Sequence, residues 1–132
     1  MPYELSWYRE KRILLGTFKG AISPDDLVEV NDAAAAMIRE GTPPVHDIIN
    51  ALALDKVPFD LKMLNRSMQW FKEPNLGWVI VIAQNPLFGF FGSILGQAAG
   101  KNVRVVSSWD VAMATLSRAD ATLGDLTSTP TP

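Results

Sequence analysis

Residues 78–83 read Trp-Val-Ile-Val-Ile-Ala and lead directly into Gln84-Asn85-Pro86. A run rich in β-branched residues that ends at turn-forming residues is typical of a buried strand. No charged residue lies between Glu73 and Lys101, a stretch long enough for a membrane span of about 20 residues. However, the polar turn in its middle would be costly at the centre of a bilayer. We therefore predict a strand, a turn and then a helix in a soluble domain.

Segments on either side of this run alternate between predicted strands and helices. Ser23-Pro24-Asp25-Asp26 combines a capping serine, a proline suited to the first helical position and two acids at the positive end of a helix. Ser108 predicts another capped helix near the C-terminus. The predicted strands cover residues 3–7, 13–19, 45–51, 78–83 and 103–106, and the two other predicted helices cover 59–72 and 87–99.

The predicted elements follow one another in the order β-β-α-β-α-β-α-β-α. Alternating strands and helices predict an α/β fold, here one domain with about five strands in a mixed sheet and four helices. We expect the first two strands to be antiparallel and the inner ones largely parallel. We place the domain at residues 1–126 and predict a disordered tail over 127–132, where the sequence TSTPTP has no apolar residue.

Composition excludes several classes of function. The 132 residues carry 12 Lys and Arg against 14 Asp and Glu, a net charge of −2. This balance provides no basic field for a phosphate backbone, so we expect no nucleic-acid partner. The chain has no cysteine and a single histidine, His46, which excludes thiolate nucleophiles, cysteine zinc sites and multi-histidine metal sites. We therefore predict no catalytic residue, no metal and no cofactor, and the lack of cysteine favours a cytoplasmic location.

Two groups of polar residues are the candidates for acid–base chemistry. His46 and Asp47 are neighbours in a predicted strand, so their side chains point to opposite faces and do not form a dyad with each other. We interpret His46 as a histidine near the surface at the start of its strand. Asp55, Lys56 and Asp60 cluster at the start of the predicted helix at 59–72, and we interpret them as a solvated loop rather than an acid–base pair.

The predicted helix at 87–99 has an unusually wide apolar arc. Its Phe, Leu, Ile and Ala residues fill about half of the circumference at 100° per residue, whereas a helix on a sheet needs a stripe of about 100°. Glycines gather on the other side, each costing about 1 kcal/mol against alanine. Either this helix is internal and packs against its own neighbours, or it forms an interface between copies of the chain. The candidate interface residues are Phe88, Phe90, Gly92 and Gly96.

A second candidate contact surface lies on the predicted helix at 59–72. Trp70 falls about one position off the apolar stripe of that helix and shares a neighbouring face with Met63. An exposed Trp and Met patch would be a candidate contact surface. The alternative is a broad apolar stripe that packs entirely inside the domain.

Several segments together resemble a known family. They are Phe18-Lys19-Gly20, Ser23-Pro24-Asp25-Asp26, Val45-His46-Asp47-Ile48-Ile49-Asn50, Gly77-Trp78-Val79-Ile80-Val81-Ile82 and the closing stretch from Val103 to Ala112. In this order the chain resembles the STAS-domain superfamily, which has the SpoIIAA-like fold of anti-sigma-factor antagonists, over residues 3–119. The resemblance implies a small bacterial regulatory domain that binds proteins, and sometimes small ligands, without being an enzyme.

The resemblance also bears on phosphorylation. Phosphorylatable members carry an Asp-Ser pair at the start of their second helix, and the closest positions here are Asp60 and Leu61. Leucine has no hydroxyl to accept a phosphoryl group, so the chain is similar to the stand-alone, non-phosphorylated branch.

Three functions remain open from the sequence. The first is a non-catalytic interaction module that self-associates, most simply as a dimer, and that has a regulatory protein as a possible further partner. The second is a carrier or sensor of an apolar small molecule or lipid, with a pocket between the predicted helix at 87–99 and the sheet. The third is a peripheral membrane protein that uses the same helix, although that helix lacks a basic face.

Overall fold

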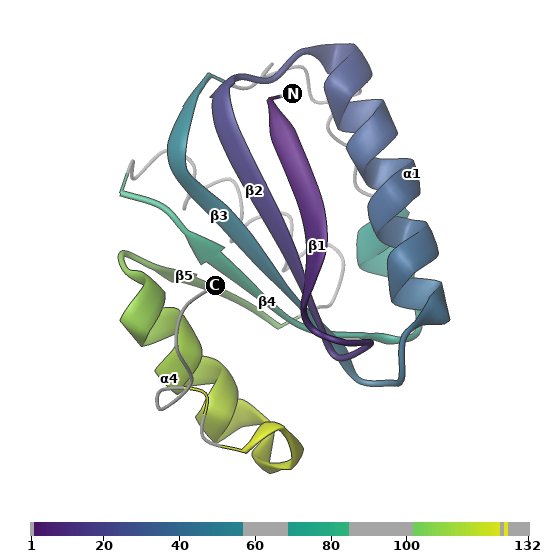
Figure 1. Ribbon diagram of the computed structural model, residues 1–132, viewed down its shortest axis with the longest axis vertical. Helices are drawn as coiled ribbons and strands as arrows, with labels where there is room; N and C mark the ends of the chain where they lie inside the picture. The colour runs from purple at the N-terminus through teal and green to yellow at the C-terminus, as the bar shows by residue number, and fades with distance from the viewer. Residues whose placement is uncertain (1, 57–68, 85–101, 125, 127–132) are drawn as a thin grey trace.

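The computed structural model describes residues 2–56, 69–84, 102–124 and 126 (Figure 1). Five strands form one sheet in the order β1-β2-β3-β4-β5. β1 pairs antiparallel with β2, and the other neighbours are all parallel. The strands are β1 Tyr3–Arg9, β2 Ile13–Ala21, β3 Val45–Lys56, β4 Leu76–Ile82 and β5 Val103–Val106.

The helix α1, Pro24–Glu40, begins at the predicted cap. The hydroxyl of Ser23 accepts a hydrogen bond from the backbone N–H of Asp26, and the Asp26 carboxylate accepts one from the backbone N–H of Ser23. This reciprocal capping satisfies two N–H groups that a helix start would otherwise leave unpaired. The remaining helices are α4, Trp109–Ala119, and the 3-10 helices η1, Gln69–Lys72, and η2, Ala121–Leu123.

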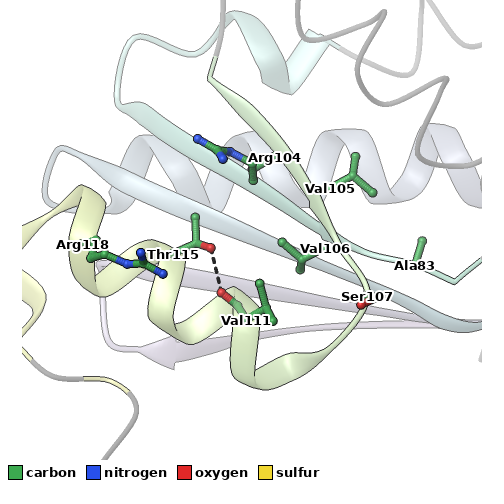
Figure 2. Close-up of a pocket in the computed structure, with 8 residues that line it drawn as sticks. All are labelled: Ala83, Arg104, Val105, Val106, Ser107, Val111, Thr115 and Arg118. Atoms are coloured by element: carbon green, nitrogen blue, oxygen red, sulfur yellow. Dashed lines mark hydrogen bonds between the residues drawn. The ribbon is translucent and has the colours of Figure 1, made fainter.

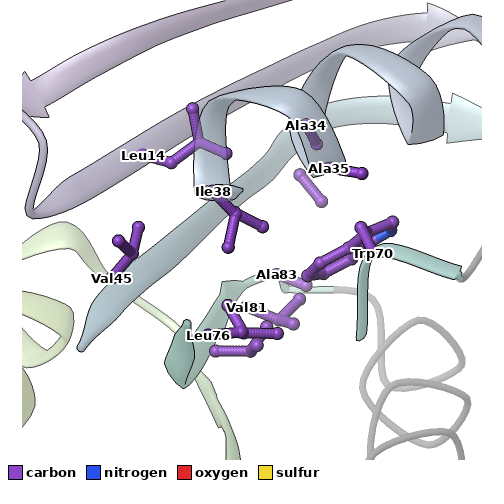
Figure 3. Packing of buried hydrophobic residues seen from close by; sticks show 11 residues of the cluster. Leu14, Ala34, Ala35, Ile38, Val45, Trp70, Leu76, Val81 and Ala83 are labelled. Carbon is purple, nitrogen blue, oxygen red and sulfur yellow. The ribbon is translucent and has the colours of Figure 1, made fainter. Parts of the chain in front are cut away.

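The sheet has an apolar core on each face because successive side chains of a strand alternate in direction. The face under α1 is built from residues such as Leu14, Val79 and Val81 together with Ile38 of the helix (Figure 3). The opposite face packs against α4 through residues such as Ile48, Ile80 and Leu116. The apolar run of β4 therefore serves both cores, which explains why it lacks polar alternation.

The predicted mixed sheet of five strands is confirmed, but the predicted four helices and their order were wrong for the part of the chain that the structure describes. That part contains two α-helices and two 3-10 helices. The end of the helix predicted at 59–72 is the 3-10 helix η1, where the backbone N–H of Trp70 donates to the side chain of Asn31. Residues 59–68 and the helix predicted at 87–99 lie outside the described residues.

The third strand is longer than predicted. β3 continues past residue 51 to Lys56 because β2 pairs with it as far as the partners Ala21 and Lys56. Asp55 is therefore an exposed strand residue and not part of a loop, while Asp60 lies outside the described residues. No helix in the described ranges is long and apolar enough to cross a membrane.

Candidate functional site

His46 is almost completely buried, at 1% exposure, so the prediction of a histidine near the surface was wrong. Its Nδ1 atom accepts a hydrogen bond of 2.9 Å from the backbone N–H of Trp78. The imidazole reaches the neighbouring strand because residue 77 is glycine. A Cβ atom at Gly77 would lie 2.7 Å from the ring, closer than packed atoms tolerate. His46 is thus held between β3 and β4.

The other ring nitrogen, Nε2, belongs to a cluster of charged and polar groups. His46 Nε2 lies 2.8 Å from Asp120 Oδ2, and one terminal nitrogen of Arg12 lies 2.8 Å from the same oxygen. Thr122 donates from both its backbone N–H and its hydroxyl to the other carboxylate oxygen, Asp120 Oδ1. Arg12 also donates to the carbonyl of Pro44 and to the hydroxyl of Thr122. This His46–Asp120–Arg12 cluster ties the starts of β2 and β3 to the end of α4.

The geometry of this cluster opposes general acid–base catalysis. Because Nδ1 accepts from a backbone N–H, the proton of the neutral ring is assigned to Nε2, where it is donated to Asp120. Both ring nitrogens are therefore occupied, and a general base must reach a substrate proton. Burial alone would raise the pKa of Asp120, but hydrogen bonds from Thr122 and His46 outweigh it and lower the pKa to about 2. The cluster is a structural clamp.

Asp47 lies on the opposite face of β3, as predicted, in the core under α1. Its side chain is 4% exposed, and its neighbours in register are Leu14 and Val79. The oxygen Oδ1 has no hydrogen-bond partner among the described residues. Burial raises the pKa of Asp47 from 3.8 to about 7. A carboxyl group without a partner in an apolar core opposes folding once it ionises.

A pocket lies between β5 and α4 and extends to the carboxyl end of β4 (Figure 2). Its volume is about 560 Å³. Arg104 enters it from β5 and Arg118 from the last turn of α4, and both side chains are exposed. The apolar wall includes Val106 and the half-exposed Val111. No acidic residue occurs among the described residues that line this pocket.

Of the predicted interface residues, Trp70 is the one that lies within the described ranges. Trp70 is 4% exposed and packs in the core under α1, where Figure 3 shows its ring among the aliphatic side chains. It therefore forms no exposed patch, in keeping with the alternative of an internal apolar stripe. The other candidates lie outside the described residues: Met63, Phe88, Phe90, Gly92 and Gly96.

Apart from His46, sequence reasoning missed the residues that form the two polar sites. Asp120 was not singled out, although it lies one residue beyond the last turn of α4 and binds His46 across 74 positions of sequence. Arg12, Arg104 and Arg118 were likewise not selected. For the His46–Asp120–Arg12 cluster, the one signal in the sequence was a histidine within a predicted strand. The pocket between β5 and α4 has no signal in the local sequence, because its residues come from separate elements.

No family model and no curated protein sequence matches the chain. A solved structure does match, a protein of the DUF3478 family from Shewanella loihica PV-4, described as uncharacterized and as having a SpoIIAA-like fold. The match covers 86% of this chain and 91% of that chain, with a TM-score of 0.65 and 12% sequence identity. The SpoIIAA-like fold that the sequence resemblance implies is thereby confirmed.

Proposed function

We propose that this chain is a non-catalytic, STAS-like regulatory module that acts by binding protein surfaces. The observation that carries the proposal is the SpoIIAA-like fold, which the chain shares with the Shewanella protein over most of both lengths. Interaction modules need a stable scaffold rather than an exposed nucleophile and base. The enclosed environment of His46, whose two ring nitrogens are both bonded, favours this function over general acid–base chemistry.

The proposed module works without a phosphorylation switch. Leu61 is the closest position to the serine that phosphorylatable STAS domains carry, and leucine offers no oxygen to a kinase. We expect that incubation with an anti-sigma-type kinase and ATP adds no phosphate between residues 55 and 72. Peptide mass spectrometry of the treated protein measures this directly. A phosphopeptide from that range would refute this part of the proposal.

The module is further proposed to self-associate through the apolar side chains of residues 87–99. Phe88 and Phe90 lie near the two edges of the expected apolar arc, so one of them faces the partner. About 400 Å² of buried apolar surface contributes about 10 kcal/mol, against association costs of about 4–15 kcal/mol. A dimer of modest affinity is therefore the expected state, and a symmetric pair is its simplest form.

Sedimentation velocity tests self-association. The wild-type protein is expected to sediment as an oligomer at high micromolar concentration, and either Phe88→Glu or Phe90→Glu is expected to give a folded monomer by circular dichroism. Val28→Glu is the matched control, because Val28 is an exposed apolar residue of α1, at 39% exposure, outside the segment. A monomeric wild-type protein would contradict the proposal, as would two phenylalanine variants that both remain oligomeric.

A further inference from the structure

We propose that the pocket between β5 and α4 binds a small amphiphilic anion, an apolar chain that ends in a carboxylate or phosphate group. The charged group pairs with Arg104 and Arg118, and the apolar chain lies over Val106 and Val111. This inference is independent of self-association, because none of these residues belongs to the segment 87–99.

The charge of the pocket is the first argument. The whole chain has a net charge of −2, yet two guanidinium groups line this pocket and no acidic residue does so among its described lining. The ion pairs within the described ranges involve neither Arg104 nor Arg118. Two unpaired guanidinium groups at one pocket attract an anion, and their flat arrays of donors suit the two oxygens of a carboxylate or phosphate.

Each arginine makes one contact inside the domain that leaves its terminal donors for a ligand. The guanidinium carbon of Arg104 lies 5.8 Å from the centre of the Trp78 ring, in a cation–π contact that uses none of its N–H donors. The Nε atom of Arg118 donates to the carbonyl of Ala114 at 3.4 Å, so its two terminal nitrogens remain for a ligand. Restraint of these long side chains before binding lowers the entropy cost of holding an anion.

The remaining walls explain why the anion should carry an apolar chain. In Figure 2 the guanidinium groups of Arg104 and Arg118 lie toward one end of the pocket, while Val106 and Val111 lie nearer its middle. Val111 is an exposed apolar side chain, at 46% exposure. The hydroxyl of Thr115 donates to the carbonyl of Val111, so this hydroxyl has no proton left for an anion. The arginines are thus the donors, and the valines are an apolar surface that a chain would cover.

The position and size of the pocket agree with a ligand site. The lining reaches Val106, Ser107 and Ala83 at the carboxyl ends of β5 and β4, where open α/β sheets bind ligands. Arg104 and Arg118 lie at the other end of the pocket, near the start of β5 and the end of α4. The volume of about 560 Å³ lies within the range of about 300–1,000 Å³ that is common for small-molecule pockets.

Four ligands separate the contributions of the head group and the chain. Octyl phosphate, octanoate, octanol and inorganic phosphate are titrated into the full chain, and binding is followed by amide chemical shifts. We expect octyl phosphate, octanoate or both to bind, with shifts at Val106, Ser107 and Val111. Binding of only one of the two identifies the head group as phosphate or carboxylate. The proposal is overturned if neither binds, if octanol binds as tightly as the better anion, or if inorganic phosphate binds as tightly as octyl phosphate.

Variants test the two arginines. Arg104→Gln and Arg118→Gln are each expected to weaken binding of the better anion by about tenfold or more, because each removes charge-assisted hydrogen bonds. Arg118→Lys keeps the charge but loses the guanidinium fork, and should weaken binding less. Lys19→Gln, an exposed change of charge on β2, is the matched control. With folding verified by circular dichroism, glutamine variants that bind as tightly as Lys19→Gln would refute the site.

Discussion

Replacing Asp120 with alanine is expected to lower the free energy of unfolding by about 3 kcal/mol, the low end of the cost of removing one partner from a buried ion pair, because Asp120 is itself 11% exposed. The carboxylate of Asp120 accepts from His46, Arg12 and Thr122 at once. The side chains of His46 and Arg12 are 2% and 22% exposed, so water replaces the lost acceptor poorly. The loss also releases the end of α4 from the starts of β2 and β3.

Urea denaturation at neutral pH measures this cost, and Glu10→Ala, at an exposed position, is the matched control. Asp120→Asn separates shape from charge, because its amide oxygen still accepts from His46 but carries no charge for Arg12. A loss no larger than that of an exposed ion pair, about 1 kcal/mol or less, would show that the clamp adds little to stability.

The contribution of the Asp120 carboxylate to stability depends on pH in the acidic range. The pKa of Asp120 is lowered from 3.8 to about 2 in the folded protein, so the unfolded chain binds a proton first as the pH falls. The stability that ionised Asp120 contributes is therefore complete above pH 3.8 and is lost as the pH falls from there toward 2, by about 2 kcal/mol in all. The difference between wild type and Asp120→Asn should shrink over that range.

The elements that were predictable are those whose signal is local. The capping residues at Ser23 and Ser108 and the apolar run of β4 act on their immediate neighbours, and all three appear where the sequence indicates. The end of the helix expected at 59–72 is a 3-10 helix, in which the N–H of Trp70 donates to Asn31, a residue 39 positions away in the sequence. The length of β3 likewise depends on its pairing with β2 and not on its own pattern.

The polar sites were not predictable because each joins residues that are distant in the sequence. His46 looks like a surface residue when its neighbours alone are considered, and it is buried because Asp120 and the N–H of Trp78 satisfy both nitrogens. Taken singly in the sequence, Arg104 and Arg118 give no sign of a binding site. They become a candidate site only when β5 and α4 bring them to one pocket that no described carboxylate lines.

Asp47 should be the opposite case to Asp120, a carboxyl group whose removal stabilises the protein. Its pKa is raised by burial to about 7, so the folded protein keeps a proton that the unfolded chain releases near pH 3.8. The stability is therefore unaffected by this group below pH 3.8 and falls as the pH rises from there through 7. The full loss above pH 7 amounts to about 4 kcal/mol.

Asp47→Asn removes this titration, at the cost of an unpaired buried amide of about 1–3 kcal/mol. We expect the variant to be more stable than wild type by about 2 kcal/mol at pH 8 and no more stable at pH 4, as measured by urea denaturation at both values. Asp55→Asn is the matched control, because Asp55 lies exposed on the same strand and should change stability little at either pH. If Asp47→Asn is less stable than wild type at pH 8, the buried carboxylate has a partner that stabilises its charge. The conclusion that ionised Asp47 destabilises the folded protein would then be wrong.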